Sequence, residues 1–539
     1  MPERAQLTSQ VTIKVGGTKL QQTTTSLIVE VVIDQHAHLP HMFTIRLHDP
    51  DLQLLDTGPF DIAKEVDISA SIDEEGNEAF PLIKGEITAL EPEFHAGMNA
   101  ELVVRGYDKS HRLFRETRSK SYLNVKDSDL AEEIAQKIGL KAEVDATSIV
   151  YEHIYQHNQS DLAFLMQRAW RIGFECFVDD GSLYFRKPIN RGKEVTLTWG
   201  QDLLSFHPRM TVAEQVKRVT VRGWDAERQK PIVGQAESGK LYPKIQEPKD
   251  GAAWAAAFSG ESKLVVVDQP VVSQSEADLL AKARLDELSG AFIEAEGMAS
   301  RRPDIRAGKT VELLGLGERM SGVYLATQAT HRYSHEGLST TFSVRGTRFG
   351  LLTEQLVGRT PLDRYPSVVT GVVTNTEDPK KWGRVKVKYA WMSEDDESDW
   401  ARVVGVGAGP DAGYFIIPEV DDEVVVAFGY GDFGQPIVIG GLWHGKAAPP
   451  PEGIGAASGE KPQVRTWHSR KGHKIIFYDD SANKVQIETA GGLQIVLDDT
   501  ESSISIKAQR DVTINAGGNL VLKAKGNVDI NGTLINLNS

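Results

Sequence analysis

Residues 503–534 divide into four octads that read SISIKAQR, DVTINAGG, NLVLKAKG and NVDINGTL. The second and fourth positions of each octad are large and apolar, and the sixth is alanine or glycine. Residues two apart lie on the same face of a β-strand, so the repeat predicts short strands with two inward side chains each. The predicted core positions are Ile504, Ile506, Val512, Ile514, Leu520, Leu522, Val528 and Ile530.

One such strand cannot cover its own apolar face, and an eight-residue rung leaves little room for a single chain to coil around a core. Neighbouring copies of the chain supply the missing walls, so we expect an intertwined β-helix with a shared core. Three chains enclose a line of side chains without leaving a sheet edge, which favours a homotrimer. The pairs Val485/Ile487 and Leu493/Ile495 repeat the spacing upstream, one residue out of register.

Two different regions precede this repeat. The stretch KAAPPPEGIGAASGEKP (446–462) is rich in proline, glycine and alanine and predicts a linker. Before it come the short apolar runs VVTGVVTNT, RVKVKYA, DWARVV, YFIIPEV, DEVVVAFG and PIVIGGL. Five or six short strands in about 80 residues favour a small closed barrel of the OB-fold type.

The first 355 residues mix strands and helices in an α+β pattern. VTIKVGGTKL predicts a hairpin that turns at Gly16-Gly17. DSDLAEEIAQKIG and SDLAFLMQRAWRIG predict helices with Asp127 and Ser160 as N-caps, and SEADLLAKARLDELSG predicts a third that ends at Gly290.

Composition excludes several classes of protein. The chain has 539 residues and a net charge of −15, which argues against nucleic acid and anionic membrane as partners. Its single cysteine, Cys176, excludes an intrachain disulfide framework, and we expect a buried structural thiol. No apolar run approaches the roughly 20 residues that span a bilayer, and the N-terminus lacks a secretory pattern. We expect synthesis in the cytoplasm without a signal peptide.

The histidine-rich motifs do not predict a metal site. DQHAHLPH brings His36, His38 and His41 close together, but no fourth ligand or catalytic carboxylate accompanies them. We expect a surface loop there, and structural roles for His468 and His473.

Two further motifs suggest chemistry only superficially. GVGAGPDAG, from Gly405, lacks the G-K-[ST] ending of a phosphate-binding loop, so we expect a connection between barrel strands. Asp395, Asp396 and Glu397 are adjacent acids, which is typical of a solvated loop rather than of paired glycosidase carboxylates. We therefore expect no catalytic residue, no metal and no cofactor.

Three segments carry a resemblance to a known family. GRVKVKYAWMSEDDESDWARVVGVGAGPDAGYFIIPEVDDEVVVAFGYGDFGQPIVIGGLW resembles the OB-fold of VgrG proteins of type VI secretion and of contractile phage-tail hub-and-spike proteins. RTWHSRKGHKIIFYDDSANKVQIETAGGLQIVLDD is similar to that family's transition into its needle, and QHNQSDLAFLMQRAWRIGFECFV to its hub. The whole chain most resembles spike subunits of extracellular contractile injection systems.

The resemblance implies a mainly β fold with an α+β N-terminal region. Residues 1–355 would form hub domains of two β-barrels with helical insertions, 356–445 an OB-fold barrel, 446–462 a linker, and 463–539 a trimeric β-helical needle. It implies a structural spike and baseplate hub in a phage tail-like particle, which we expect to be extracellular. The hub would adapt the inner tube to a needle that contacts the target membrane mechanically.

The implied partners are two further copies of the chain, inner-tube proteins, baseplate proteins, cargo effectors and a PAAR-type tip protein. The open strand ends favour docking of the tip protein at Ile535, Leu537, Asn538 and Ser539. An enzymatic alternative is a spike that hydrolyses cell-wall or surface polysaccharide, and a third is an OB module that binds carbohydrate or nucleic acid. A phage tail, a type VI apparatus and an extracellular particle all remain open as the parent machine.

Overall fold

The computed structural model describes residues 10–71, 79–188, 195–239, 244–245, 247, 249–258, 262–346, 367–452 and 463–536. These residues belong to two compact units, one ending at Gly441 and the other beginning at Leu442. None of the helices within the described ranges is long and apolar enough to cross a membrane.

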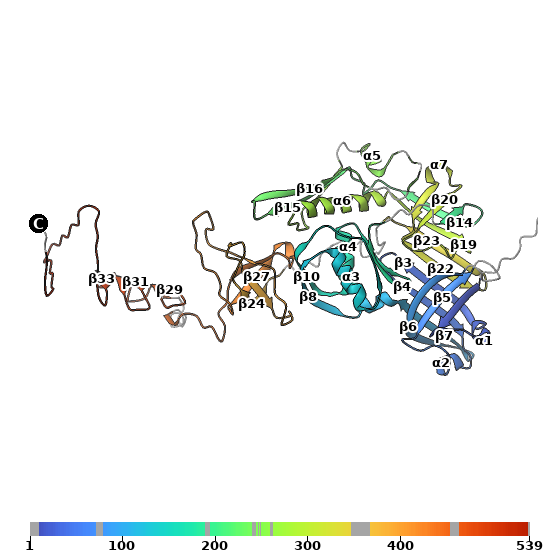
Figure 1. Cartoon of the computed structure of the whole chain (residues 1–539), viewed down its shortest axis with the longest axis horizontal. Helices are drawn as coiled ribbons and strands as arrows, with labels where there is room; N and C mark the ends of the chain where they lie inside the picture. Colours follow the sequence, from blue (N-terminus) through green and yellow to red (C-terminus); the bar gives the residue numbers. More distant parts are fainter. Residues whose placement is uncertain are drawn as a thin grey trace, which may run out of the picture. The chain divides into compact units, whose positions relative to one another are not determined.

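The first unit begins with antiparallel strands that form one half of an 11-stranded sheet, in the order β14-β19-β23-β22-β3-β4-β7-β6-β5-β1-β2 (Figure 1). The predicted hairpin is confirmed, because β1 pairs with β2 and both Gly16 and Gly17 have positive φ angles. The elements are β1 (Gln10–Val15), β2 (Thr18–Lys19), α1 (Gln22–Thr25), β3 (Ile28–His36), β4 (Leu39–His48), α2 (Gln53–Asp56), β5 (Glu65–Ser71), β6 (Ala79–His95) and β7 (Asn99–Asp108).

A helical region follows and has its own core. Two of its helices match the prediction, and the side chain of Ser160 caps the second by accepting a hydrogen bond from Ala163 N at 3.3 Å. Cys176 is buried here, which raises the pKa of its thiol to about 12 and confirms a structural role. The elements are η1 (Lys109–Phe114), β8 (Thr117–Val125), α3 (Asp127–Lys137), β9 (Lys141–Val144), β10 (Tyr151–Ser160), α4 (Asp161–Arg171), β11 (Glu175–Asp179) and β12 (Ser182–Arg186).

Asp127 is not the N-cap that we expected. It is the first residue of α3, it is buried, and its Oδ1 accepts a hydrogen bond of 2.5 Å from Arg168 Nε on α4. A buried carboxylate without such a partner would be strongly destabilising, so the ion pair explains why an acidic residue occupies this position.

A second barrel-like body completes the hub. Its strands β19, β23 and β22 belong to the large sheet, because β22 pairs with β3 of the first body. The two bodies therefore share one sheet, but each has its own hydrophobic core. The third predicted helix is α6. The elements are β13 (Val195–Thr198), β14 (Leu203–Met210), β15 (Arg218–Asp225), β16 (Lys230–Ala236), β17 (Lys244–Ile245), α5 (Gly251–Ala255), β18 (Lys263–Val266), α6 (Gln274–Gly290), β19 (Ile293–Ser300), β20 (Thr310–Leu314), α7 (Gly317–Met320), β21 (Gly322–Leu325), β22 (Gln328–Ser334) and β23 (Gly337–Val344).

The predicted small barrel is present and closed. Its strand order is β25-β24-β27-β28-β26, and Val385 and Ala401 close the ring by exchanging backbone hydrogen bonds of 3.0 and 2.7 Å. YFIIPEV forms no strand, which corrects our expectation. The elements are β24 (Val369–Asn375), β25 (Lys386–Tyr389), β26 (Arg402–Val403), β27 (Glu423–Phe428), η2 (Gly429–Gly431) and β28 (Pro436–Gly441).

The second unit contains a five-stranded antiparallel meander in chain order. Its strands are β29 (Val464–His468), β30 (Lys474–Tyr478), β31 (Lys484–Glu488), β32 (Gln494–Asp498) and β33 (Ser503–Lys507). The described residues after Lys507, up to residue 536, contain no strand. Only the first octad therefore has a strand partner within its own chain.

Residues of the histidine-rich motif do not form the surface loop that we expected. His36 ends β3 and Leu39 begins β4, so the motif is a tight β-hairpin. His38 and His41 are buried, and the backbone N of His41 donates to Asp108 Oδ2 at 2.8 Å. Register with the neighbouring strands, which the motif alone does not reveal, places these rings inside.

Another histidine makes the hub core sensitive to acid. His331 on β22 is fully buried, its Nδ1 lies 3.0 Å from Thr340 Oγ1, and burial lowers its pKa to about 3. The folded state disfavours the protonated ring, so this residue supports stability above pH 6.5 and loses that support as the pH falls toward 3. The loss is about 1.4 kcal/mol per pH unit within this window.

We expect His331→Gln, which keeps a polar side chain but does not titrate, to flatten the pH dependence of hub unfolding between pH 6 and pH 3. Thermal unfolding monitored by circular dichroism across this range measures the effect. His335→Gln is the matched control, because His335 is exposed at the end of the same hairpin. Identical pH profiles for the wild type and His331→Gln would contradict the assignment.

Candidate assembly surfaces

Two apolar ladders cross the meander of the second unit. Cross-strand register aligns Phe477, Val485, Leu497 and Ile504 in one ladder, and Ile475, Ile487, Ile495 and Ile506 in the other. Both ladders lie on the same face of the sheet, because their members are two residues apart along each strand. Several remain substantially exposed, including Phe477 (46%), Leu497 (43%) and Ile504 (72%).

The octads continue this apolar surface along the chain. All eight predicted core positions are exposed within one chain, from 54% at Val528 to 72% at Ile504. A soluble protein rarely leaves such a long apolar row in contact with water. The row is therefore a candidate interaction surface, and its place in a core shared between copies stays a prediction.

The upstream repeat falls on two neighbouring strands. Val485 and Ile487 lie on β31 and pair with Leu497 and Ile495 on β32, and Leu493 lies just before β32. The eight-residue spacing along the chain does not coincide with the cross-strand pairing, because the chain reverses between the two strands.

A polar contact joins the barrel to the hub. Asp396 Oδ1 accepts a hydrogen bond of 3.2 Å from Ser121 N, and Ser121 Oγ donates to the backbone O of Glu397 at 3.0 Å. The side chain of Glu397 also accepts from Lys386 Nζ at 2.5 Å. The three acids lie in a loop, as expected, and Asp395 is exposed, but Asp396 and Glu397 are half-buried because strand β8 contacts them.

Aromatic residues extend this joint. Trp391 Nε1 donates to Tyr155 OH at 2.9 Å, and the His157 ring lies 4.1 Å from Phe433 between centroids. His153, on the same strand β10, lies 3.3 Å from Ser121 Oγ through its Nε2, and burial lowers its pKa. The barrel therefore packs on β8 and β10 through rings as well as hydrogen bonds.

A protruding segment of the barrel, which we name the barrel arm (residues 404–416), contains the GVGAGPDAG motif. It folds back on itself, because Gly409 and Ala412 exchange backbone hydrogen bonds of 3.0 and 3.2 Å and Tyr414 N donates to Val406 O at 3.0 Å. The expected connection between strands is confirmed. Sequence reasoning missed its exposure, since Tyr414 and Phe415 belong to an apolar run that we expected to be a barrel strand but are 60% and 81% exposed.

The described residues contain one cluster with the spacing of a metal site, and it already has a cation. Glu93, His95 and Glu101 come from the β6–β7 hairpin. Arg46 Nη1 contacts Glu93 at 2.7 Å and Glu101 at 2.6 Å, and this hydrogen bonding lowers the pKa of Glu93. The guanidinium supplies the charge that a metal would bring, so we assign no metal here. Recognising the turn after His95 could have revealed the cluster from sequence.

His468 and His473 have structural contacts. His468 Nε2 lies 3.3 Å from Glu452 Oε2, and His473 Nδ1 accepts a hydrogen bond from Ala490 N at 3.2 Å. Both are consistent with roles in the turns of the second unit.

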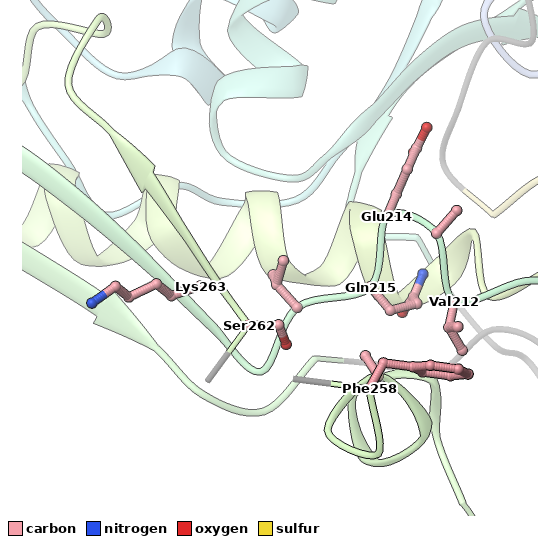
Figure 2. Close-up of a pocket in the computed structure, with 9 residues that line it drawn as sticks. Val212, Glu214, Gln215, Phe258, Ser262 and Lys263 are labelled. Atoms are coloured by element: carbon pink, nitrogen blue, oxygen red, sulfur yellow. The ribbon is translucent and has the colours of Figure 1, made fainter. Parts of the chain in front are cut away.

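An open pocket of about 560 Å³ lies beside β18 in the hub. Figure 2 shows the Phe258 ring below Val212, with the Glu214 side chain pointing upward and the Lys263 side chain pointing to the left. Glu214 is the single carboxylate among its described lining residues. The described lining residues therefore do not supply the pair of carboxylates that polysaccharide hydrolysis generally uses.

Of the expected tip-docking residues, Ile535 is 48% exposed. Leu537, Asn538 and Ser539 lie outside the described residues. Tip docking at these positions stays a prediction.

Two family models match the chain. The model described as Alg8 N-terminal domain matches residues 5–335, and the model described as type VI secretion system/phage-baseplate injector OB domain matches residues 369–443. The second match coincides with the closed barrel.

Curated relatives are spike proteins that are much longer than the matched regions. The type VI secretion system spike protein VgrG1b of Pseudomonas aeruginosa is 24% identical over 259 residues, covering 45% of this chain and 34% of the relative. The actin cross-linking toxin VgrG1 of Vibrio cholerae is 29% identical over 231 residues, covering 38% of this chain and 20% of the relative. The matches thus span about a third or less of these relatives.

A solved structure shares the fold. The structure described as Francisella PdpA-VgrG complex, half-lidded, contains a chain that is 10% identical, with a TM-score of 0.51. The likeness covers 93% of this chain and 88% of that one. It shows that the order of hub, barrel and C-terminal extension is a VgrG-type fold.

We expect Phe433→Ala to loosen the joint and the barrel core together, because it removes a largely buried ring that contacts both His157 and Phe428. The expected cost is about 3–5 kcal/mol. Hydrogen exchange should rise in β10 as well as in β27. Tyr430→Ala is the control, because Tyr430 is 67% exposed and should change neither strand. Faster exchange in β27 with β10 unchanged would contradict a packed joint.

Proposed function

The chain belongs to the family of the Alg8 N-terminal domain, whose model spans more than half of its 539 residues, and to the VgrG-like spike proteins, and from this membership we propose that it is the central spike and baseplate hub of a contractile injection system. In this proposal the hub adapts an inner tube to a needle that punctures the target envelope. The carrying observation is the apolar row that one chain leaves exposed from Phe477 to Ile530.

The exposed row supports a shared core. Full burial of one such side chain contributes about 1.5–3 kcal/mol, so eight octad residues per chain supply a large driving force for association. A β-strand also needs partners for its backbone groups, and the described octads after Lys507 have none within the chain. Association of copies satisfies both requirements at once.

Three copies are the smallest number that encloses a line of side chains without a sheet edge. A homotrimer also gives the hub a useful symmetry. Each chain contributes two barrel-like cores, so three chains present six, which suits a tube with sixfold symmetry. Inner-tube and baseplate proteins are the partners that we propose for this hub.

We propose the boundaries 1–355, 356–445, 446–462 and 463–539 for the hub, barrel, linker and needle. Leu534 and Ile535 are adjacent exposed apolar residues, which favours contact with a partner protein. A PAAR-type tip protein fits this role, and cargo effectors are further proposed partners. We propose that the protein functions in a phage tail-like particle that is extracellular. Its contact with the target membrane is mechanical.

The proposed role is not enzymatic. The relatives with matched regions include structural spike proteins, while the name of the Vibrio cholerae relative describes an actin cross-linking toxin. That match covers 20% of the toxin, so its activity does not transfer to this chain. Release of reducing sugar or cell-wall fragments by the purified protein would instead support the hydrolytic alternative.

The shared core is tested with a pair of adjacent substitutions in the full-length protein. Ile514→Asp places a carboxylate at a core position, where burial without a partner costs several kcal/mol, and should dissociate or weaken the trimer. Thr513→Asp changes the neighbouring residue on the opposite face and should leave the trimer intact. Light scattering measures the mass, for which the wild type should give three times 59.3 kDa.

A protein that ends at Pro462 provides the second arm of this test and should also weaken or dissociate. A folded, soluble, monomeric full-length protein would contradict the shared core. The tail would then have to form a solenoid from a single chain, and an enzymatic function would regain support.

A further inference from the structure

The barrel arm exposes more apolar surface than a monomeric barrel should retain. Five large side chains within its 13 residues are exposed by more than half: Val404 (58%), Val406 (74%), Tyr414 (60%), Phe415 (81%) and Ile416 (59%). They are not scattered, because Tyr414 and Val406 are joined by a backbone hydrogen bond of 3.0 Å across the two limbs. Such a contiguous patch is typical of an interaction site.

The arm is shaped and anchored rather than loose. Val404 N donates to Val438 O on β28 at 2.9 Å, which fixes the start of the arm to the barrel wall. After the arm, Ile417 returns to pack against the barrel core. The ring of Phe415 lies beside Gly383, where an added Cβ would approach it to 3.1 Å. The apolar side chains are therefore presented outward from a defined backbone.

The charge distribution indicates which protein surface the barrel arm contacts. Residues 367–441 contain 13 Asp and Glu against 6 Lys and Arg, but the arm carries a single charge, Asp411. Acidic barrels repel one another over most of their surface, so two copies can approach closely only through a neutral patch. The arm is such a patch, and it offers apolar contact without bringing acids together.

The length of the segment between the barrel and the meander also favours another copy of this chain as the partner of the arm. Between Gly441 at the end of β28 and Val464 at the start of β29 lie 22 residues. If the octads of several copies share a core, these short segments keep the barrels of those copies near one another. The effective concentration of one barrel around another is then on the order of millimolar. The partner that the arm meets most often is the barrel of another copy.

We propose that the barrel arm docks on the OB barrel of a neighbouring copy of this chain, burying Tyr414 and Phe415 between subunits. This inference rests on the proposed function, since it requires the copies to be joined by their octads. It assigns the stretch YFII, which the sequence pattern predicts as part of a barrel strand, to a contact between subunits. The interchain contact then extends from the needle into the barrel.

The test places a photoreactive p-benzoylphenylalanine at position 415 of the full-length protein. Assembly from an equal mixture of ¹⁵N-labelled and unlabelled copies distinguishes links between chains from links within one chain. We expect cross-linked peptides that join position 415 of one copy to residues 367–441 of another. The same probe at Val406 tests the other limb of the arm, and the probe at exposed Glu377, outside the arm, is the control.

Light scattering on the same samples separates the two hypotheses. A monomeric protein would overturn the proposed function and this inference together. A trimer in which positions 415 and 406 give no link to another copy's barrel, or link only to their own chain or to residues 463–536, would overturn this inference alone. Equal links from Glu377 and position 415 would also overturn it, because the contact would then not be specific to the arm.

Discussion

A β-strand needs hydrogen-bonding neighbours for its backbone and a covering layer for its apolar face, and the last three octads of this chain obtain neither from their own polypeptide. In the meander, strand pairing satisfies the backbone from β29 to β33 but leaves two apolar ladders on one face. Beyond Lys507 the described residues lack strand partners as well. Association between copies is the arrangement that meets both needs, and the proposed needle, its stiffness and its symmetry all depend on it.

The hub differs from the meander and octads, because it contains buried charged side chains rather than a row of exposed apolar ones. Arg168 pairs with Asp127, and Arg171 Nη2 lies 2.7 Å from Glu276 Oε1, with every partner about nine-tenths buried or more. Removing one partner of such a pair leaves an uncompensated buried charge, so these contacts fix how α3, α4 and α6 pack. Hydrogen bonds and ring contacts also join the barrel to β8 and β10, so the hub and the barrel are packed against each other.

Predictions from the sequence were correct where residues close together in the chain determine the local structure. The hairpin at Gly16-Gly17, the cap at Ser160 and the alternating β27 all depend on residues close in sequence. They failed where a distant strand decides. Arg168 forms an ion pair with Asp127, which we expected to be a helix cap; Asp108 on β7 accepts a hydrogen bond from the backbone of His41; and Ser121 on β8 contacts Asp396. The predicted strand at YFIIPEV was wrong because a short apolar run does not by itself show that a neighbouring strand pairs with it.

The octad repeat, the acidic composition and the order of barrel, linker and repeat were determined by the sequence itself, because periodicity and charge are properties of neighbouring residues. These features sufficed to predict a mainly β chain with a row of apolar residues in need of other copies. Only the tertiary structure decided the closure of the barrel between Val385 and Ala401, the ladder register of the meander and the outward course of the barrel arm. Each of these depends on contacts between residues far apart in the chain, whose pairing is selected by packing and hydrogen bonding rather than by local pattern.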